Sequence, residues 1–415
     1  MDAGTATPDD VASAATGPGS GCPVAEFGRL REQGPVVDFP SFGGDSGVLI
    51  TRHDDVRAVL TDPRLRADAS TVDGALNALS DLLGNLGIPP ELDWMKRSLL
   101  SLDGAEHTRL RKLVSRAFTV RRVNALRPRV ETLTEDLLDD IAAVGAGGGS
   151  VDLVQAFAYP LPIAVICELV GVPKPDRPRW RELAELLTSP APDRMPPVIH
   201  AVVDQIRVLV EARRNTPADD LMTVLVEVHD DGDRLTENEM ITMVFELVIA
   251  GFETTAHLIS KSVQVLLTRP DQLAVLRSEP GLWPRAVHEL VRTCGPIPTS
   301  LPRYAATDIE FGGVTVPAGS TVTAGILTAN FDPEFTEDPD ELDVRRETGH
   351  GERHLGFGQG AHYCLGAALA RQEAEVALRG VFERFPDLRL ADPVTGPAPL
   401  GFARLLELPV LVASG

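Results

Sequence analysis

The stretch HLGFGQGAHYCLG, residues 354–366, places Cys364, one of only four cysteines in the 415-residue chain, in a loop rich in glycine. Glycine lets the backbone turn sharply and lets another group approach backbone amides closely. Small apolar residues then follow at helical spacing over 367–385, so a helix begins directly after the sulfur. A helix start lowers the pKa of a thiol, because the helix dipole favours negative charge there. The pattern favours a thiolate at Cys364. A buried structural cysteine and a zinc ligand shared with His354 and His362 are the alternatives.

The overall composition is that of a globular protein, with 43% hydrophobic and 24% charged residues. The net charge of −21 argues against broad nucleic-acid binding and against a basic surface that faces a membrane. The cysteines lie far apart without a CxxC pair, which excludes a disulfide framework and a zinc ribbon and favours a reducing cytoplasm. Residues 1–21 are polar, and we expect a disordered tail there without signal peptide or membrane anchor. The remainder, 22–415, is expected to form the functional domain.

Helical periodicity dominates the chain. Apolar residues recur every three or four positions over four segments, 110–141, 161–170, 199–213 and 282–294. Strand patterns are few and include 47–52 and 309–324, where Gly312 and Gly313 predict a hairpin turn. The glycine-rich stretch 145–150 is short and is interpreted as a loop within one domain. The predicted fold class is therefore mainly α with small β-sheets, in a single large domain.

The longest predicted helix runs from a capping box at Thr236 and Glu239 to Thr268, just before Pro270. Its centre reads AGFETT, residues 250–255, which brings a glycine, a carboxylate and two β-branched hydroxyl residues into a core helix. A glycine there costs about 1 kcal/mol relative to alanine, and a functional role is one explanation for that cost. The alternative is a helix contact at Gly251, with the threonines bonded to the preceding turn.

Two further pairs lie at helical spacing. His107 and Arg111 are four residues apart on one helical face, where both could donate to one anionic group. Glu289 and Arg292 are three residues apart. Taken singly, the first pair is also typical of a solvated basic face and the second of a surface ion pair worth well under ~1 kcal/mol.

Together these motifs resemble those of the cytochrome P450 family, the haem-thiolate monooxygenases, over roughly residues 25–412. The matching loop positions are Phe357, Gly358, Gly360, His362, Cys364 and Gly366. The stretch 250–255 resembles the family's oxygen-activating segment, and Glu289 with Arg292 resembles its E-x-x-R pair. NFDPEF followed by DVRR resembles the meander, with Arg346 as third member of a Glu-Arg-Arg triad. Phe331 departs from the pattern, since an arginine is usual there.

The resemblance implies that haem b is bound through the Cys364 thiolate, with Phe357 against the ring near the sulfur. It assigns the haem propionates to His107, Arg111, Arg303 and His362, and further haem contacts to Gly358, Ala250 and Gly251. It also implies that Thr254 and Glu253 deliver protons during oxygen activation, and that Glu289, Arg292 and Arg346 form a buried structural clamp.

By the same resemblance, the substrate contacts are mostly apolar: Leu99, Leu100, Ile297, Thr299, Ser300 and Phe402. The expected activity is hydroxylation or epoxidation of an apolar small molecule, in natural-product biosynthesis, with O2 and electrons from NAD(P)H. An acidic ferredoxin and its reductase would supply the electrons to a cytoplasmic monomer. The alternative is a non-oxygenating haem-thiolate protein, namely a peroxygenase, isomerase, coupling enzyme or ligand-binding protein. The acid and alcohol pair at 253–254 favours the monooxygenase.

Positive charge gathers in one segment, 107–129, which has no Asp or Glu. It contains eight basic residues: Arg109, Arg111, Lys112, Arg116, Arg121, Arg122, Arg127 and Arg129. A solvated helix face is the simpler interpretation. A cationic patch on an acidic protein would also attract an acidic electron donor, so we expect the ferredoxin to dock there.

Overall fold

The computed structural model describes residues 23–40, 46–75, 88–116, 118–187, 195–227, 229–230, 233–347, 352–392 and 405–412. The expected tail at 1–21 lies outside them. The chain divides into two compact units. Unit 1 comprises Met1–Asp81, Ser260–Cys364 and Arg389–Val410, and unit 2 comprises Leu82–Ile259, Leu365–Leu388 and Leu411–Gly415.

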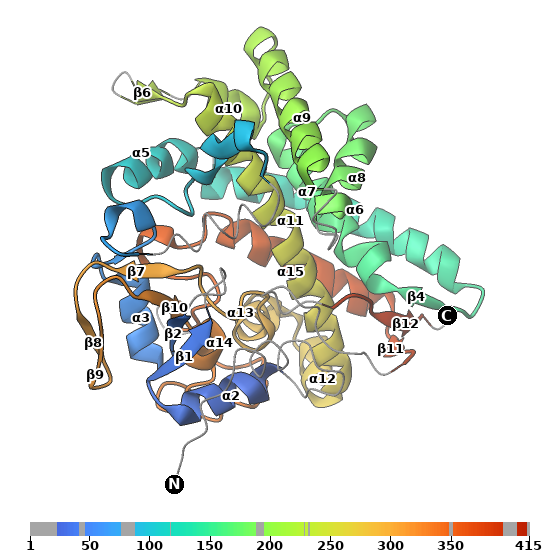
Figure 1. Ribbon diagram of the computed structural model, residues 1–415. Coiled ribbons are helices and arrows are strands. Elements are labelled where there is room, and N and C mark those ends of the chain that lie inside the picture. The colour runs from blue at the N-terminus through green and yellow to red at the C-terminus, as the bar shows by residue number, and fades with distance from the viewer. Residues whose placement is uncertain are drawn as a thin grey trace. The chain divides into compact units, whose positions relative to one another are not determined.

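Unit 1 is built around a five-stranded sheet in the order β1-β2-β10-β7-β3 (Figure 1). Its strands are β1 (Val36–Pro40), β2 (Ser46–Ile50), β10 (Thr321–Ala324), β7 (Arg303–Ala305) and β3 (Leu65–Arg66). β2 and β10 run parallel, and the other pairs are antiparallel. Because parallel neighbours need a long crossover, strands far apart in the sequence meet in one sheet.

The apolar core of unit 1 joins this sheet to nearby helices. Ile50 and Val322 pack with Val56 and Val59 of α3 (His53–Thr61) and with Ile326 of α14 (Ile326–Asn330). The other helices of unit 1 are α2 (Pro23–Gln33), α12 (Pro270–Ser278) and α13 (Trp283–Cys294), with short 3-10 turns at Ala69–Thr71, Pro280–Leu282 and Gly360–His362. β11 (Arg389–Leu390) lies beside β12 (Pro409–Leu411).

The predicted hairpin is present as β8 (Ile309–Phe311) paired with β9 (Val314–Val316). Gly312 and Gly313 both have positive φ, 52° and 84°. Two successive positive φ angles are what a two-residue hairpin turn requires, and glycine meets that requirement at no steric cost.

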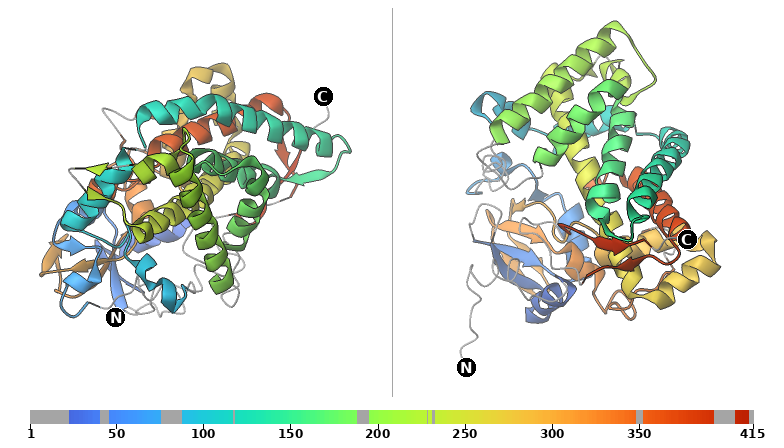
Figure 2. Two further views of the ribbon diagram at one scale, coloured as in Figure 1. Left: turned by 90° about the horizontal axis from the view of Figure 1, so that it is seen from above. Right: turned by 90° about the vertical axis from the view of Figure 1, so that its right-hand side faces the viewer.

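Unit 2 is almost entirely helical. Its helices are α5 (Gly104–Ser115), α6 (Val120–Gly145), α7 (Pro160–Val170), α8 (Arg177–Leu187), α9 (Met195–Asn215), α10 (Leu221–Glu227) and α15 (Ala367–Arg384), with a π-helical turn at Val154–Ala158 and 3-10 turns at Pro90–Lys96 and Lys174–Asp176. Short strands lie at β4 (Ser150–Asp152), β5 (His229–Asp230) and β6 (Asp233–Arg234). α15 packs along α6 (Figure 2). Gly380 allows this approach, since a Cβ there would lie 2.9 Å from the Thr134 side chain.

The longest helix, α11 (Glu237–Thr268), begins in unit 2 and ends in unit 1. The predicted capping box is formed: the Glu239 N–H donates to Thr236 Oγ1 at 3.2 Å, and the Thr236 N–H donates to Glu239 Oε2 at 2.7 Å. α11 is long and apolar enough to cross a bilayer, yet 61% of its most apolar window is buried inside the protein. That burial is typical of a core helix.

The expected fold class is confirmed, because helices dominate the described residues and the sheets are small. The periodic segment 110–141 comprises two helices, since α5 ends at Ser115 and α6 begins at Val120. Thr119 caps the new helix, with its Oγ1 accepting from the Arg122 N–H. The glycine stretch 145–150 is a connection between α6 and β4, as predicted.

Candidate active site

The cysteine loop in unit 1 is shaped by its glycines. Gly358 and Gly360 have φ angles of 72° and 74°, a backbone region that residues with a side chain rarely adopt. A Cβ at Gly360 would also lie 2.8 Å from the Leu60 carbonyl oxygen. The Cys364 N–H donates to the Phe357 carbonyl at 2.9 Å and closes the loop. The backbone therefore holds the sulfur just ahead of α15.

The surface of this loop is open. No residue from Phe357 to Gly366 is buried, although Phe357 and Leu365 are apolar. Cys364 is partly exposed, whereas Cys167 and Cys294 are buried. Burial raises the pKa of the Cys167 thiol to about 12 and also raises the pKa of Cys294. Among the described cysteines, Cys364 is thus the one that presents its sulfur to a ligand.

These features fit a haem. A haem iron takes a single protein sulfur on one side, and the loop presents one accessible thiol among glycine backbone amides. The zinc alternative is not supported, because the one cluster of three metal-ligating side chains among the described residues joins His354 to His288 and Glu352 and leaves Cys364 out.

A buried ion-pair network lies beside this loop in unit 1. Arg292 donates from Nε and Nη2 to the two oxygens of Glu289, both at 2.8 Å, and the two residues are 4% and 3% exposed. Arg346 Nε donates to Glu289 Oε1 at 3.1 Å, so the structure brings the three predicted clamp residues together. Further donors on both arginines bind backbone carbonyls, at Asn330, Pro339 and Glu341 for Arg292 and at Glu337, Asp338 and Glu341 for Arg346.

Phe331, the departure from the family's pattern, contributes to the same network. The Arg292 guanidinium lies 5.1 Å from the centroid of the Phe331 ring. A cation over an aromatic face is attracted by the ring quadrupole. In this chain the aromatic residue therefore interacts with the clamp in place of a local salt bridge.

The other predicted residues of unit 1 are spread over three elements. Arg303 lies on β7 and is 8% exposed, which places a guanidinium in a setting where anionic partners are strongly favoured. His362 ends the short turn Gly360–His362 and is partly exposed. Ile297, Thr299 and Ser300 are partly exposed on the segment before β7, where the Ser300 N–H donates to the Ala324 carbonyl at 2.8 Å. Phe402 lies outside the described residues.

The centre of α11 lies in unit 2. Residues 250–255 show features of both interpretations, a functional segment and a helix contact. A Cβ at Gly251 would lie 2.7 Å from Ile166 Cδ1 of α7, so the glycine permits a close helix contact. Thr254 Oγ1 donates to the Ala250 carbonyl at 2.6 Å, in the preceding turn. Ala250 is nevertheless exposed and Thr254 partly exposed, on a helix whose neighbouring Phe252 is fully buried. This turn of α11 therefore presents small side chains outward.

Glu253 belongs to a buried cluster that sequence reasoning missed. Its Oε1 lies 3.6 Å from His257 Nε2, one turn further along α11. The same nitrogen lies 3.3 Å from the Tyr159 hydroxyl, and the two rings meet edge to face at 5.5 Å. The exposed fractions are 8% for Glu253, 0% for His257 and 9% for Tyr159. The i,i+4 spacing of Glu253 and His257 was visible in the sequence, but the contribution of Tyr159 was not.

The loop that carries Leu99 and Leu100 is fixed to α11 by a second carboxylate, Glu246. The Ser98 hydroxyl and the backbone N–H groups of Leu99 and Leu100 all donate to it. Removal of the carboxylate from water raises the pKa of Glu246 to about 7, although these donors act to lower it. Leu100 is 47% exposed, so the loop presents an apolar side chain beyond the carboxylate.

His107 and Arg111 lie one turn apart on α5, with His107 3% exposed and Arg111 partly exposed. Much of the basic segment around them is engaged by acidic partners within unit 2. The ion pairs are Arg109 with Glu239, Arg122 with Asp219, Arg127 with Glu131 and Glu375, and Arg129 with Glu168. Lys112, Arg116 and Arg121 are exposed. The predicted patch is therefore smaller than the sequence suggested.

Comparison with known proteins gives one consistent result. The family model described as cytochrome P450 matches residues 282–394. The chain is 43% identical to cytochrome P450 107B1 of Saccharopolyspora erythraea, over 88% of each chain. It is 41% identical to the 6-deoxyerythronolide B hydroxylase of the same organism, over 92% of this chain and 94% of the relative.

Solved structures agree with this likeness. The cytochrome P450 PksS of the bacillaene polyketide synthase of Bacillus subtilis 168 matches with a TM-score of 0.84 and 33% identity. The match covers 94% of this chain and 97% of that one.

Proposed function

Since the chain belongs to the cytochrome P450 family and is a monooxygenase of secondary metabolism, we propose that it hydroxylates or epoxidises an apolar, medium-sized to large natural product such as a polyketide macrolactone. The observation that carries the proposal is the open glycine loop with the partly exposed thiol of Cys364. Haem iron, which the family uses, supplies O2 activation and the transfer of one oxygen atom to substrate.

We assign binding of the haem to the residues that the family resemblance indicates. Cys364 donates its sulfur as thiolate, and Phe357 and Gly358 shield it. The haem carboxylates need cationic or donor partners, and the buried His107 and Arg303 suit that role, because a buried charge is strongly disfavoured without a partner. Arg111 and His362 complete this set, and Ala250 and Gly251 are assigned as further haem contacts.

Proton delivery is assigned to Thr254 and Glu253. The Thr254 hydroxyl is fixed by its bond to the Ala250 carbonyl, which orients its oxygen as an acceptor. Glu253 is assigned the relay of protons, with His257 Nε2 at 3.6 Å from its Oε1. Burial of this cluster limits the access of water, so that protons reach the site through these side chains.

The substrate class follows from the outward-facing apolar groups. In unit 2, Leu99, Leu100 and Ala250 leave apolar surface exposed. In unit 1, Ile297 and Thr299 are partly exposed, and Ser300 adds one hydroxyl. A named relative acts on 6-deoxyerythronolide B, a substrate of the size and polarity that such groups accept.

For electrons we propose an acidic ferredoxin, reduced by a ferredoxin reductase at the expense of NAD(P)H. The exposed Lys112, Arg116 and Arg121 give a cationic docking surface on a chain of net charge −21. We further propose that the protein acts as a monomer in the cytoplasm. The burial of α11 inside the fold is typical of a core helix.

The test uses purified haem-loaded protein. The reduced carbon monoxide complex should show the long-wavelength Soret band of thiolate ligation, and macrolactones should shift the ferric Soret band on titration. Cys364→Ser should abolish the carbon monoxide band, with Cys167→Ser as a matched control that keeps it. Retention of the band in Cys364→Ser would overturn the assignment, and product formed without O2 would overturn the monooxygenase.

A further inference from the structure

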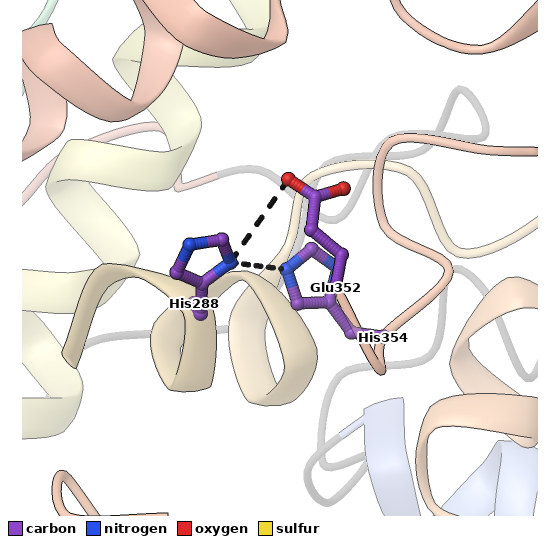
Figure 3. A group of neighbouring side chains, drawn as sticks. All are labelled: His288, Glu352 and His354. Carbon is purple, nitrogen blue, oxygen red and sulfur yellow. Dashed lines mark hydrogen bonds and ion pairs between the residues drawn. The ribbon is translucent and has the colours of Figure 1, made fainter. Parts of the chain in front are cut away.

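A cluster of three side chains in unit 1 has no part in the chemistry described above. His288 projects from α13, and Glu352 and His354 come from the segment that leads into the cysteine loop; Figure 3 shows the three side chains pointing toward one another. His288 Nδ1 lies 3.2 Å from His354 Nε2 and 4.0 Å from Glu352 Oε1. One ligand atom from each residue lies within 4.8 Å of the other two.

From this arrangement we propose a second metal site, in which His288 Nδ1, His354 Nε2 and one carboxylate oxygen of Glu352 bind a divalent transition-metal ion, best Zn²⁺. Two imidazoles and one carboxylate are a known zinc ligand set, with water in the fourth position. Zinc bonds of about 2.0 to 2.1 Å in tetrahedral geometry separate two ligand atoms by about 3.3 Å. The 3.2 Å between the imidazole nitrogens already meets this distance, and Glu352 Oε1, at 4.0 Å from His288 Nδ1, must move closer.

The surroundings keep the three ligands in a binding-competent form. Burial of the His354 ring lowers its pKa to about 3, so the ring is neutral at physiological pH. The Tyr363 hydroxyl donates to Glu352 Oε2 at 2.9 Å, which orients the carboxylate and leaves Oε1 toward His288. A second hydrogen-bonded layer of this kind is what fixes ligands at metal sites.

In the metal-free protein His354 Nδ1 accepts from the Gly356 N–H at 3.3 Å, so the ring proton is on Nε2 and is donated to His288. Binding of the metal to Nε2 moves that proton to Nδ1 at the expense of this long hydrogen bond. No oxidation change is involved, which suits zinc.

Access and charge are compatible with a cation. His288 and His354 line a cavity of about 430 Å³, and the side chains of His288 and Glu352 are 23% and 17% exposed. The cavity is also lined by four arginines and four acidic residues: Arg292, Arg345, Arg346, Arg353, Glu289, Glu337, Asp343 and Glu347. The four positive side chains are balanced by four negative ones, so no excess of positive charge around the cavity repels a metal cation.

A metal here would tie the segment before the cysteine loop to α13. The experiment titrates haem-loaded protein with Zn²⁺ against a chromophoric chelator, and zinc-edge X-ray absorption identifies the ligands. We expect one zinc per chain with nitrogen and oxygen neighbours at about 2.0 to 2.1 Å and no sulfur at about 2.3 Å. Glu352→Gln and His288→Gln should each weaken binding at least tenfold, and Tyr363→Phe by about tenfold.

His200→Gln is the matched control, because His200 also contacts a glutamate, Glu91, at 2.9 Å but on the exposed surface. It should leave zinc affinity unchanged. If a variant fails to fold, the zinc-edge spectrum of the wild-type protein still tests the proposed site. Absence of a stoichiometric zinc, sulfur ligation, or an unchanged affinity in both cluster variants would overturn the site. None of these results bears on the monooxygenase assignment.

Discussion

Two buried glutamates, Glu289 in unit 1 and Glu253 in unit 2, differ in what surrounds them. Glu289 lies 2.8 Å from Arg292, receives Arg346 at 3.1 Å, and also accepts from the Asp343 N–H at 3.0 Å. Glu253 has His257 at 3.6 Å, and that histidine reaches Tyr159 at 3.3 Å. The first carboxylate is matched by permanent charges and the second lies beside groups that exchange protons.

The difference separates a structural charge from a functional one. An arginine keeps its proton at any physiological pH, so the Glu289 network has one protonation state and serves as a fixed brace. Histidine is the side chain that most often exchanges protons near neutral pH, and the Glu253 cluster contains a histidine where the Glu289 network has arginines. The same substitution, glutamate to glutamine, should therefore act on folding at one site and on turnover at the other.

Glu289→Gln should have the largest effect. Removing one partner of a buried ion pair leaves the guanidiniums of Arg292 and Arg346 without their counter-charge, which costs about 3 to 5 kcal/mol in the free energy of unfolding. Urea unfolding and haem content measure this loss. Arg345→Gln, which breaks the exposed pair with Glu279, is the control and should change stability by under ~1 kcal/mol. If the Glu289→Gln variant were stable and loaded with haem, the Glu289 network would not be a structural brace.

Glu253→Gln should leave the free energy of unfolding within about 1 kcal/mol and lower kcat about 100-fold, because general acid catalysis contributes factors of this order. Product formed per NAD(P)H consumed is the second measurement. Thr254→Ala should reduce that ratio more than it reduces NAD(P)H consumption, with electrons diverted to peroxide. Unchanged turnover and coupling in both variants would place proton delivery elsewhere.

Glu246 is an intermediate case, a carboxylate without a cation that binds backbone and hydroxyl donors. Its folded pKa of about 7 lies above the ordinary value of 4.5, so the folded protein retains a proton that the unfolded chain releases. The free energy of unfolding should therefore fall as pH rises from 4.5 to 7, by about 1 to 2 kcal/mol after allowance for partial exposure. Glu246→Gln should flatten this slope, and the exposed Glu185→Gln should not.

The smallest effect concerns charges in solvent. Ferredoxin-supported turnover should fall a few-fold as salt rises to 0.1 M, where charges beyond about 10 Å are screened. Lys112→Glu should slow the first electron transfer and spare substrate affinity. Arg129→Glu is the comparison, since Arg129 is engaged by Glu168 at 3.3 Å. Electron-transfer kinetics insensitive to salt and to Lys112→Glu would place the docking surface elsewhere.

The local features could be predicted well from the sequence, because they depend on neighbours in the chain. The capping box at Thr236, the hairpin at Gly312 and Gly313, and the helix after Cys364 all follow from spacing and from glycine. The Glu289 and Arg292 pair was also visible, as was the place of Arg346 by resemblance.

Long-range partners were the part that spacing could not reveal. The basic segment 107–129 was predicted as a patch, yet Glu239, Glu375 and Glu168 reach it from other helices. Tyr159 approaches His257 from 98 positions away, and Glu352 meets His288 only once α13 and the loop are folded together. The apolar spacing also continues through 116–119, although one helix ends and the next begins there. The cap at Thr119 starts the new helix without changing that spacing.

The close approach of Gly251 to Ile166 couples two positions on different helices. A Cβ at position 251 would meet Ile166 Cδ1 at 2.7 Å and Cγ1 at 2.9 Å, so the end of the Ile166 side chain must move to admit it. Ile166→Ala alone opens a gap between α7 and α11, which a methyl group at position 251 would partly refill. The effects of Gly251→Ala and Ile166→Ala on stability should therefore be non-additive, so either change alters what the other costs.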